Sequence, residues 1–254
     1  MSTKLLHLAC FMLFWPFVVN VSLKIVNGVV VEPHSLPYMV ALESTINERT
    51  IRCSGSLIET NKVLTAAYCV YGAKSVSITL GAHNLDEKEE TQLKLTSTNF
   101  TIHEDYEDDT HLNNIAVIHL EKEVTLTDSI NTISTPTLED LLVSYNDDTG
   151  LVSGWGRYND TIPDYSDVLR KIEVTIIPYL ACTISYLGQI KSSQMCTSGM
   201  QDGQNICLGD TGSPLVVNGT QVGIASYGSD FGCSVGMPGV YTRLTSYFFW
   251  LTRV

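Results

Sequence analysis

Apolar and polar residues alternate along much of the chain with the period of a β-strand. Residues 76–80 (VSITL) and 172–176 (IEVTI) alternate at every position, so each would place its apolar side chains on one face. Residues 114–120 (NIAVIHL) and 221–227 (QVGIASY) are mostly apolar and are typical of strands buried on both faces. Many short strands without long helices between them predict an all-β barrel or sandwich. The turn signals between the strands are Asp202-Gly203, Asn218-Gly219 and Pro238-Gly239.

A helical pattern appears at the end of the chain. Tyr247, Trp250, Leu251 and Val254 are spaced at i, i+3, i+4 and i+7, which gives a helix with one apolar face. We therefore predict one terminal helix over about residues 245–254.

The first 22 residues have the layout of a secretory signal peptide. Lys4 precedes an apolar run over residues 5–19, and the more polar residues 20–22 (NVS) follow it. The run is short for a membrane span, and the Trp-Pro pair at 15–16 argues against the alternative of a buried N-terminal helix. No later stretch is long and apolar enough to span a bilayer. We therefore expect a soluble, secreted, extracellular protein with no membrane partner.

The cysteine pattern agrees with secretion. Of seven cysteines, Cys10 lies in the expected signal peptide, and an even number remains for disulfide bonds whose connectivity the count leaves open. Zinc is the other interpretation, but no CxxC pair or His/Cys cluster supports it. The remaining cysteines are Cys53, Cys69, Cys182, Cys196, Cys207 and Cys233. Sequons compatible with N-glycosylation begin at Asn99, Asn159 and Asn218.

The net charge of −12 excludes nucleic acid as a partner, because phosphate binding requires a basic surface. Acidic runs occupy residues 86–90 and 104–109. We interpret them as solvated loops, with a docking surface for a basic partner as the alternative.

Several motifs follow one another along the chain from residue 24 to residue 244. The main motifs are KIVNG at 24–28, VLTAAYC at 63–69, NIAVIHL at 114–120 and CLGDTGSPL at 207–215. Supporting motifs are SGWG at 153–156, GIASYG at 223–228 and PGVYTRL at 238–244. In this order they resemble the trypsin/chymotrypsin-like family of serine peptidases, and arthropod members in particular. The resemblance covers nearly the whole chain after the signal peptide.

The resemblance implies a fold of two packed six-stranded antiparallel β-barrels with a C-terminal helix. The expected barrels cover about residues 25–128 and 129–244, after a short propeptide at 23–24. By the same resemblance, the disulfides pair Cys53 with Cys69, Cys182 with Cys196 and Cys207 with Cys233.

The three positions that carry the family's catalytic triad hold different residues here. Tyr68 stands in place of the histidine, and a phenol with a pKa of about 10 is a poor proton acceptor at neutral pH. Asn114 stands in place of the aspartate, a change that lowers turnover about 10⁴-fold in an active member. Thr211 stands in place of the serine, and its hydroxyl needs a base to become a nucleophile.

No other residue is expected to replace the missing groups. Ser213 replaces a family glycine and is not at the nucleophile's position, and none of the mature chain's histidines aligns with a catalytic position. These are His34, His83, His103, His111 and His119.

Other parts of the family's machinery are retained. Lys24 precedes Ile25 as the basic residue precedes the cleaved bond in the family's zymogens, and the freed ammonium is expected to pair with Asp210. That pairing would order the oxyanion-hole amides of Gly209 and Thr211.

The resemblance also defines a specificity pocket with a neutral base, because Asn205 stands where trypsins carry an aspartate. The expected pocket residues are Asn205, Ser226, Tyr227, Gly228 and Gly239. No metal or cofactor is expected, since Ala82 stands where calcium-binding members have a glutamate.

The sequence therefore predicts a secreted, catalytically inactive protease homologue that acts by binding. The expected partner is an extracellular protein, such as a protease, an inhibitor or a host-defence protein, bound by a monomer. A weakly active endopeptidase that uses Thr211 is the alternative, and a carrier of small ligands is a third class that no motif favours.

Overall fold

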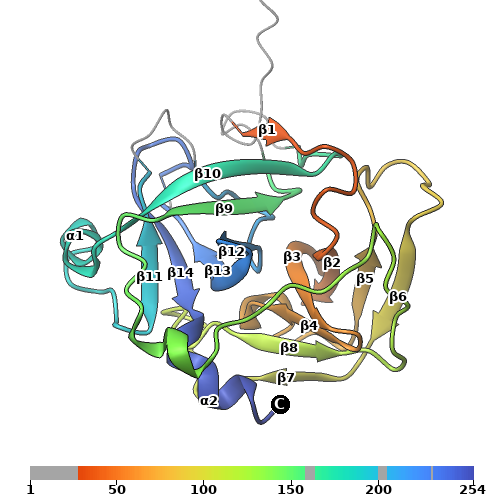
Figure 1. The fold of residues 1–254 in the computed structure, drawn as a ribbon, viewed down its shortest axis with the longest axis horizontal. Coiled ribbons are helices and arrows are strands. Elements are labelled where there is room, and N and C mark those ends of the chain that lie inside the picture. The colour runs from red at the N-terminus through yellow and green to blue at the C-terminus, as the bar shows by residue number, and fades with distance from the viewer. Residues whose placement is uncertain (1–27, 158–163, 200–204, 230) are drawn as a thin grey trace, which may run out of the picture.

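The computed structural model describes residues 28–157, 164–199, 205–229 and 231–254, and most of them form two antiparallel sheets (Figure 1). The expected signal peptide, the propeptide, Lys24, Ile25 and Asn159 lie outside the described residues. No helix among the described residues is long and apolar enough to cross a membrane.

The later half of the chain forms a closed barrel. Its strands follow the order β10-β11-β14-β13-β12-β9, and β9 pairs again with β10, which closes a ring of six. This barrel lies on the left of Figure 1. The strands are β9 (Thr149–Gly154), β10 (Arg170–Ile177), β11 (Gln194–Thr197), β12 (Pro214–Val217), β13 (Thr220–Tyr227) and β14 (Gly239–Arg243).

The earlier half forms a seven-stranded half-barrel in the order β6-β5-β2-β3-β4-β8-β7. Its two outer strands, β6 and β7, are consecutive in the chain and separated only by residues 98–99. The expected arrangement of two packed antiparallel β-structures is thus confirmed. One is a closed six-stranded barrel, and the other is an open half-barrel of seven strands. The strands of the half-barrel are β2 (Met39–Ile46), β3 (Arg49–Glu59), β4 (Lys62–Thr65), β5 (Val76–Leu80), β6 (Leu93–Ser97), β7 (Phe100–Ile102) and β8 (Ala116–His119).

One short strand near the start of the described chain pairs with the C-terminal barrel. The strand β1 (Val29–Val30) lies within the range 25–128, yet it pairs with β10 of the other sheet through Val30 and Arg170. The start of the chain therefore extends the C-terminal barrel, because its backbone groups find their partners along the edge of β10.

The alternation seen in the sequence matches the burial of the strands. In β5, Val76, Ile78 and Leu80 are fully buried and Ser77 is exposed. In β10, the buried side chains are those of Ile172, Val174 and Ile176. Each sheet encloses its own apolar core, and a smaller cluster that includes Met39 and Trp155 packs between β2 and β9. Full burial of each such aliphatic side chain contributes roughly 1.5–3 kcal/mol.

The predicted terminal helix is present but shorter than expected. A 3₁₀ turn, η4 (Leu244–Tyr247), leads into the α-helix α2 (Phe248–Leu251), which lies beside β7 and β8 in Figure 1. Tyr247 and Trp250 are buried against the core of the half-barrel, as the spacing predicts. The chain thus leaves the barrel and ends on the other sheet.

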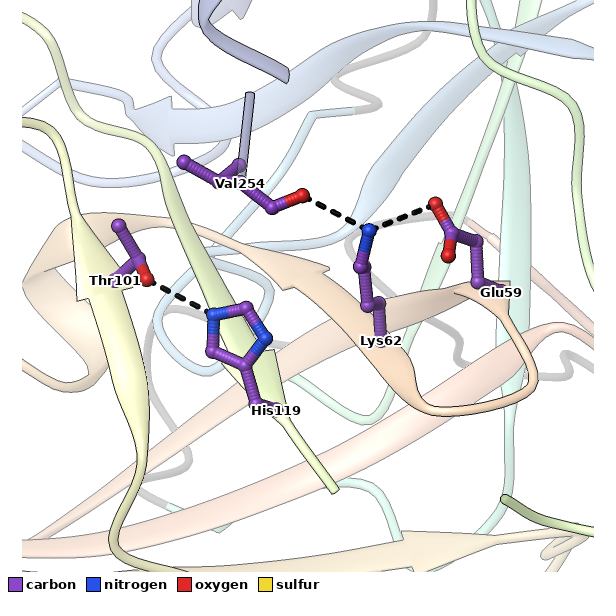
Figure 2. Close-up of polar contacts among 5 residues, drawn as sticks. All are labelled: Glu59, Lys62, Thr101, His119 and Val254. Carbon is purple, nitrogen blue, oxygen red and sulfur yellow. Dashed lines mark hydrogen bonds and ion pairs between the residues drawn. The ribbon is translucent and has the colours of Figure 1, made fainter. Parts of the chain in front are cut away.

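Lys62 at the start of β4 holds the last residue of the chain in place. Its Nζ donates to the backbone oxygen of Val254 at 2.8 Å and pairs with Glu59 at 3.0 Å (Figure 2). Nearby, Thr101 Oγ1 lies 2.9 Å from His119 Nε2. The Lys62 contact therefore connects the end of the chain to β4, whereas the Thr101–His119 contact joins the neighbouring strands β7 and β8.

Three disulfides join cysteines in the pairing that the resemblance implies. Cys53 of β3 is bonded to Cys69 in the 3₁₀ turn η2 (Ala67–Cys69). Cys182 of helix α1 (Tyr179–Ser185) is bonded to Cys196 of β11, and Cys207 is bonded to Cys233. Cross-links of this kind typically stabilise by about 2–4 kcal/mol each.

Candidate functional site

A cavity of about 210 Å³ opens where the two sheets meet. The half-barrel contributes Tyr68 from η2 and His111 from the loop between β7 and β8. The barrel contributes Thr211 from the loop before β12, and Ser226 and Tyr227 from the end of β13. Tyr68 and Thr211, two of the three positions that the resemblance compares with a catalytic triad, therefore line one cleft.

Asn114 lies beneath this cleft and is completely buried. Its Oδ1 accepts a hydrogen bond from the backbone N–H of Tyr68 at 2.9 Å, and its Nδ2 donates to Oγ of Ser226 at 2.8 Å. Its backbone oxygen accepts from Thr242 Oγ1 at 2.8 Å. The amide therefore holds η2 to β13 as a neutral link between the two sheets.

The ring of Tyr68 contacts aromatic side chains. It packs edge-on against His111 with ring centroids 5.8 Å apart, and His111 in turn lies 5.7 Å from the ring of Tyr227. Tyr227 contacts Tyr186 at 6.0 Å. Nδ1 of His111 is buried and has no hydrogen-bond partner among the described residues. We call these four rings the aromatic wall: Tyr68, His111 and Tyr227 line the cleft, and Tyr186, in contact with Tyr227, lines a neighbouring cavity.

The segment that carries Thr211 is fixed by its backbone. The carbonyl of Thr211 accepts from the N–H of Ser54 at 2.9 Å, and the N–H of Gly212 donates to Ala225 at 2.8 Å. Gly212 has φ +88°, and a Cβ there would collide with the carbonyl of Ser54. Only glycine fits, so this part of the GDTGSP motif is set by the turn itself. The Thr211 hydroxyl forms no hydrogen bond within the described part of the chain.

Asp210, the neighbour of Thr211, is a buried carboxyl group. It accepts hydrogen bonds from the backbone N–H groups of Gly156 at 2.9 Å and Cys207 at 3.0 Å. Burial raises its pKa to about 7, although these two bonds act in the opposite direction. A Cβ on Gly154 or Gly156 would collide with this carboxylate, which explains both glycines of the SGWG motif. No described cation pairs with Asp210.

The expected specificity pocket is only partly assembled. Ser226, Tyr227 and Gly228 line the cavity beside Thr211, whereas Asn205 and Gly239 do not. The side chain of Asn205 is occupied by the backbone: its Nδ2 donates to Met237 O at 2.7 Å, and its Oδ1 accepts from Ile206 N at 2.9 Å. Asn205 is therefore buried, with both ends of its amide bound to the backbone.

The loop that holds calcium in some relatives is closed here by an amide. Nε2 of Gln92 donates to Asn84 O at 2.7 Å, Glu87 O at 3.0 Å and Glu89 Oε2 at 3.1 Å. Glu89 also accepts from the N–H groups of His83 and Asn84. Burial raises the pKa of Glu89, but these hydrogen bonds outweigh it and hold that pKa below its usual value. The described residues contain no cluster of ligands suited to a metal ion.

The family model for trypsin matches residues 25–251. The chain belongs to the trypsin family of serine peptidases. It is 42% identical to a chymotrypsin of Phaedon cochleariae, over 92% of this chain and 83% of that one. It is 39% identical to brachyurin of Leptuca pugilator, over 89% and 96%. The solved structure of HL collagenase matches with a TM-score of 0.82 and 33% identity, over 89% of this chain and 96% of that one.

Membership of the trypsin family makes the cleft the expected site of action, and these relatives are named as proteases. In this member the cleft holds a phenol and a threonine hydroxyl, with a neutral amide beneath them. No hydrogen bond among the described residues joins Tyr68 to Thr211.

The sequence did not indicate that His111 would also lie in the cleft. His111 lies in a loop in which His111 and Asn113 adopt positive φ angles of 52° and 55°. No motif in the sequence predicts this loop conformation.

Proposed function

We propose that this member of the trypsin family is a secreted protein that does not hydrolyse peptide bonds and acts by binding an extracellular protein. The observation that carries the proposal is the absence of a hydrogen-bonded base for the Thr211 hydroxyl within the described residues. A hydroxyl attacks a carbonyl only when a neighbouring group removes its proton, and a phenol such as that of Tyr68 is a poor proton acceptor.

The contacts of Asn114 support the same conclusion. An aspartate in this place would orient a base and stabilise its positive charge. Asn114 instead uses both ends of its amide to link Tyr68 and Ser226, and it carries no charge. The group has a structural use in this chain that does not depend on catalysis.

The aromatic wall supports a binding role. Tyrosine side chains offer large contact areas that lose little conformational entropy, and they are enriched at protein interfaces. A cleft with such a wall can hold a segment of a protease, an inhibitor or a host-defence protein without cutting it.

The proposal is tested with the mature protein beginning at Ile25. We expect no turnover of peptide or ester substrates above a buffer blank, and no labelling of Thr211 by an active-site phosphonylating reagent. Affinity capture from the secretions of the source should recover a protein partner, and Tyr227→Ala should weaken its capture more than the surface control Lys122→Ala. Hydrolysis that disappears in Thr211→Ala would overturn the proposal.

A weakly active endopeptidase is the second candidate, and two observations favour it. The relatives are named as proteases, and His111 lines the same cavity as Thr211. In this case His111→Gln should abolish any residual hydrolysis, while His103→Gln, on the outer side of the half-barrel near Trp250, should not. Equal activity in both variants would exclude His111 as the base.

A further inference from the structure

A two-residue turn on the barrel carries an acceptor sequence for N-glycosylation. Asn218 and Gly219 connect β12 to β13, and Val217 pairs with Thr220 across the turn. Both turn residues have positive φ, 49° and 81°, as a type I′ hairpin requires. Asn218 is exposed, and Thr220 supplies the hydroxyl residue that completes the sequon. The modification can therefore be accommodated at the surface without disturbing the two strands.

The same turn borders a cavity of about 500 Å³, which Asn218 and Gly219 help to line. The floor of this cavity is the outer surface of three neighbouring strands. Leu151 of β9 lies opposite Glu173 of β10 on one side and opposite Val216 of β12 on the other. No residue that lines this cavity also lines the cleft described above. Its volume is in the range of about 300–1,000 Å³ that is typical of ligand sites.

The lining of the cavity combines apolar and polar side chains. Leu36 and Tyr38, from the segment before β2, are only partly buried and leave apolar surface at the cavity. Lys171 and Glu173 lie on the outer face of β10, since Ile172 between them belongs to the barrel core. Neither of the two charged groups forms an ion pair within the described part of the chain. A pyranose ring has C–H groups on its faces and hydrogen-bonding groups at its edge, so it requires both kinds of surface.

We propose that Asn218 carries an N-linked glycan whose first sugars lie in this cavity, against Tyr38 and Lys171. The donor is an oligosaccharide carried on a lipid diphosphate in the secretory pathway. The amide nitrogen of Asn218 forms a bond to C1 of the first N-acetylglucosamine while the bond from C1 to the diphosphate oxygen breaks. The lipid diphosphate leaves, and the amide gives one proton to a base of the transferase.

Two features favour this glycan over a free ligand as the occupant. The attachment point lies at the cavity, so a single covalent bond keeps the sugars at a high effective concentration there, and weak contacts are enough to hold them. The wall at Ser134 is fixed beside the same turn, because the N–H of Gln221 donates to the Ser134 carbonyl at 2.9 Å. The assignment rests on secretion, which the proposed function includes, and not on the absence of catalysis.

The test uses the mature protein secreted from insect cells. We expect glycopeptide mass spectrometry to find Asn218 modified in the unsubstituted protein and in Thr220→Ser, which keeps the sequon, and unmodified in Thr220→Val. Acylation of Lys171 is then followed by peptide mapping. It should be about tenfold slower in the glycosylated protein than in Thr220→Val, as expected if the sugars leave the cavity open about a tenth of the time. The exposed Lys122 is the control and should react equally in both.

An unmodified Asn218 in the secreted, unsubstituted protein would overturn the assignment. Equal acylation of Lys171 with and without the glycan would also overturn it, because sugars that extend into solvent leave the cavity open. Enzymatic removal of the glycans from the folded protein should raise the reactivity of Lys171 as Thr220→Val does, so the test stands even where that variant is poorly secreted. Hydrolysis of peptide substrates would contradict the proposed function and leave the glycan site standing.

Discussion

The backbone N–H of Tyr68 donates a hydrogen bond to the side chain of Asn114 at 2.9 Å, while the Tyr68 ring points to His111 and the aromatic wall. The main chain of η2 is therefore held at the position that a catalytic histidine would need. The side chain at that position makes contacts suited to packing. Under the proposed non-catalytic function, this backbone arrangement is kept while the side chain has another use, because the main-chain and side-chain atoms of Tyr68 make separate contacts.

This arrangement predicts a measurable coupling between Asn114 and Ser226. Asn114→Ala leaves the Tyr68 N–H and the Ser226 hydroxyl without their partner in a buried place, which should lower the free energy of unfolding by about 1–3 kcal/mol. Ser226→Ala should cost less, and the double variant should cost less than the sum of the two. Urea denaturation measures all three, with the exposed Thr98→Ala as a neutral control. Additive effects would show that the hydrogen bond contributes nothing to stability.

The proposed non-catalytic function predicts that three substitutions together would introduce hydrolysis. Thr211→Ser alone should remain inactive, since a serine without a base is still a neutral alcohol. The triple variant Tyr68→His, Asn114→Asp, Thr211→Ser supplies nucleophile, base and orienting carboxylate on a backbone that already holds their positions. We expect the triple variant alone to hydrolyse a chromogenic peptide ester above the blank. Activity of the single variant would mean that another group in the cleft, with His111 the first to examine, acts as the base.

The loop that the Gln92 amide closes is expected not to bind calcium. Calcium or EDTA should not change the unfolding temperature of the native protein, because the Gln92 amide already binds the three oxygens that face it. Gln92→Ala should lower the free energy of unfolding by about 1–3 kcal/mol. Gln92→Glu places a second carboxylate beside Glu89, so it should be destabilised without metal and recover with calcium. Stabilisation of the native protein by calcium would show that the Gln92 side chain moves aside for the ion.

The strands were predictable because side-chain direction in a strand has a period of two, and β5 and β10 follow that period. Tyr68, Asn114 and Thr211 could be singled out from the sequence because each lies inside a distinctive local motif. The pairing of β1 with β10 could not be found, since two residues carry too little pattern. His111 in the cleft was missed because its contacts depend on loop geometry and join residues far apart in the sequence.

The buried carboxyl group of Asp210 predicts an unusual dependence of stability on pH in the precursor. While Lys24 remains bonded to Ile25, no free ammonium exists at Ile25 to pair with Asp210. The folded state raises the pKa of Asp210 from 3.8 to about 7, so it holds the proton more tightly than the unfolded state does. The free energy of unfolding should therefore decrease as pH rises from about 4 to about 7, by roughly 4 kcal/mol, and should not depend on this group at higher pH.

Comparison with Asp210→Asn isolates this contribution from those of other groups. The amide oxygen of the variant can accept from a backbone N–H that the carboxylate now binds, and it does not titrate. The precursor and its Asp210→Asn variant should thus have similar stability near pH 4 and diverge in favour of the variant as pH rises, as measured by urea denaturation. The control variant Asp167→Asn changes an exposed aspartate, so its stability should have the same pH dependence as that of the unmodified precursor. After cleavage, an ammonium at Ile25 would pair with the Asp210 carboxylate, so the variant should become the less stable protein near pH 7. If the variant is more stable near pH 7 in both forms, the new N-terminus does not reach Asp210, and the pairing expected after cleavage at Lys24 is absent from this member of the family.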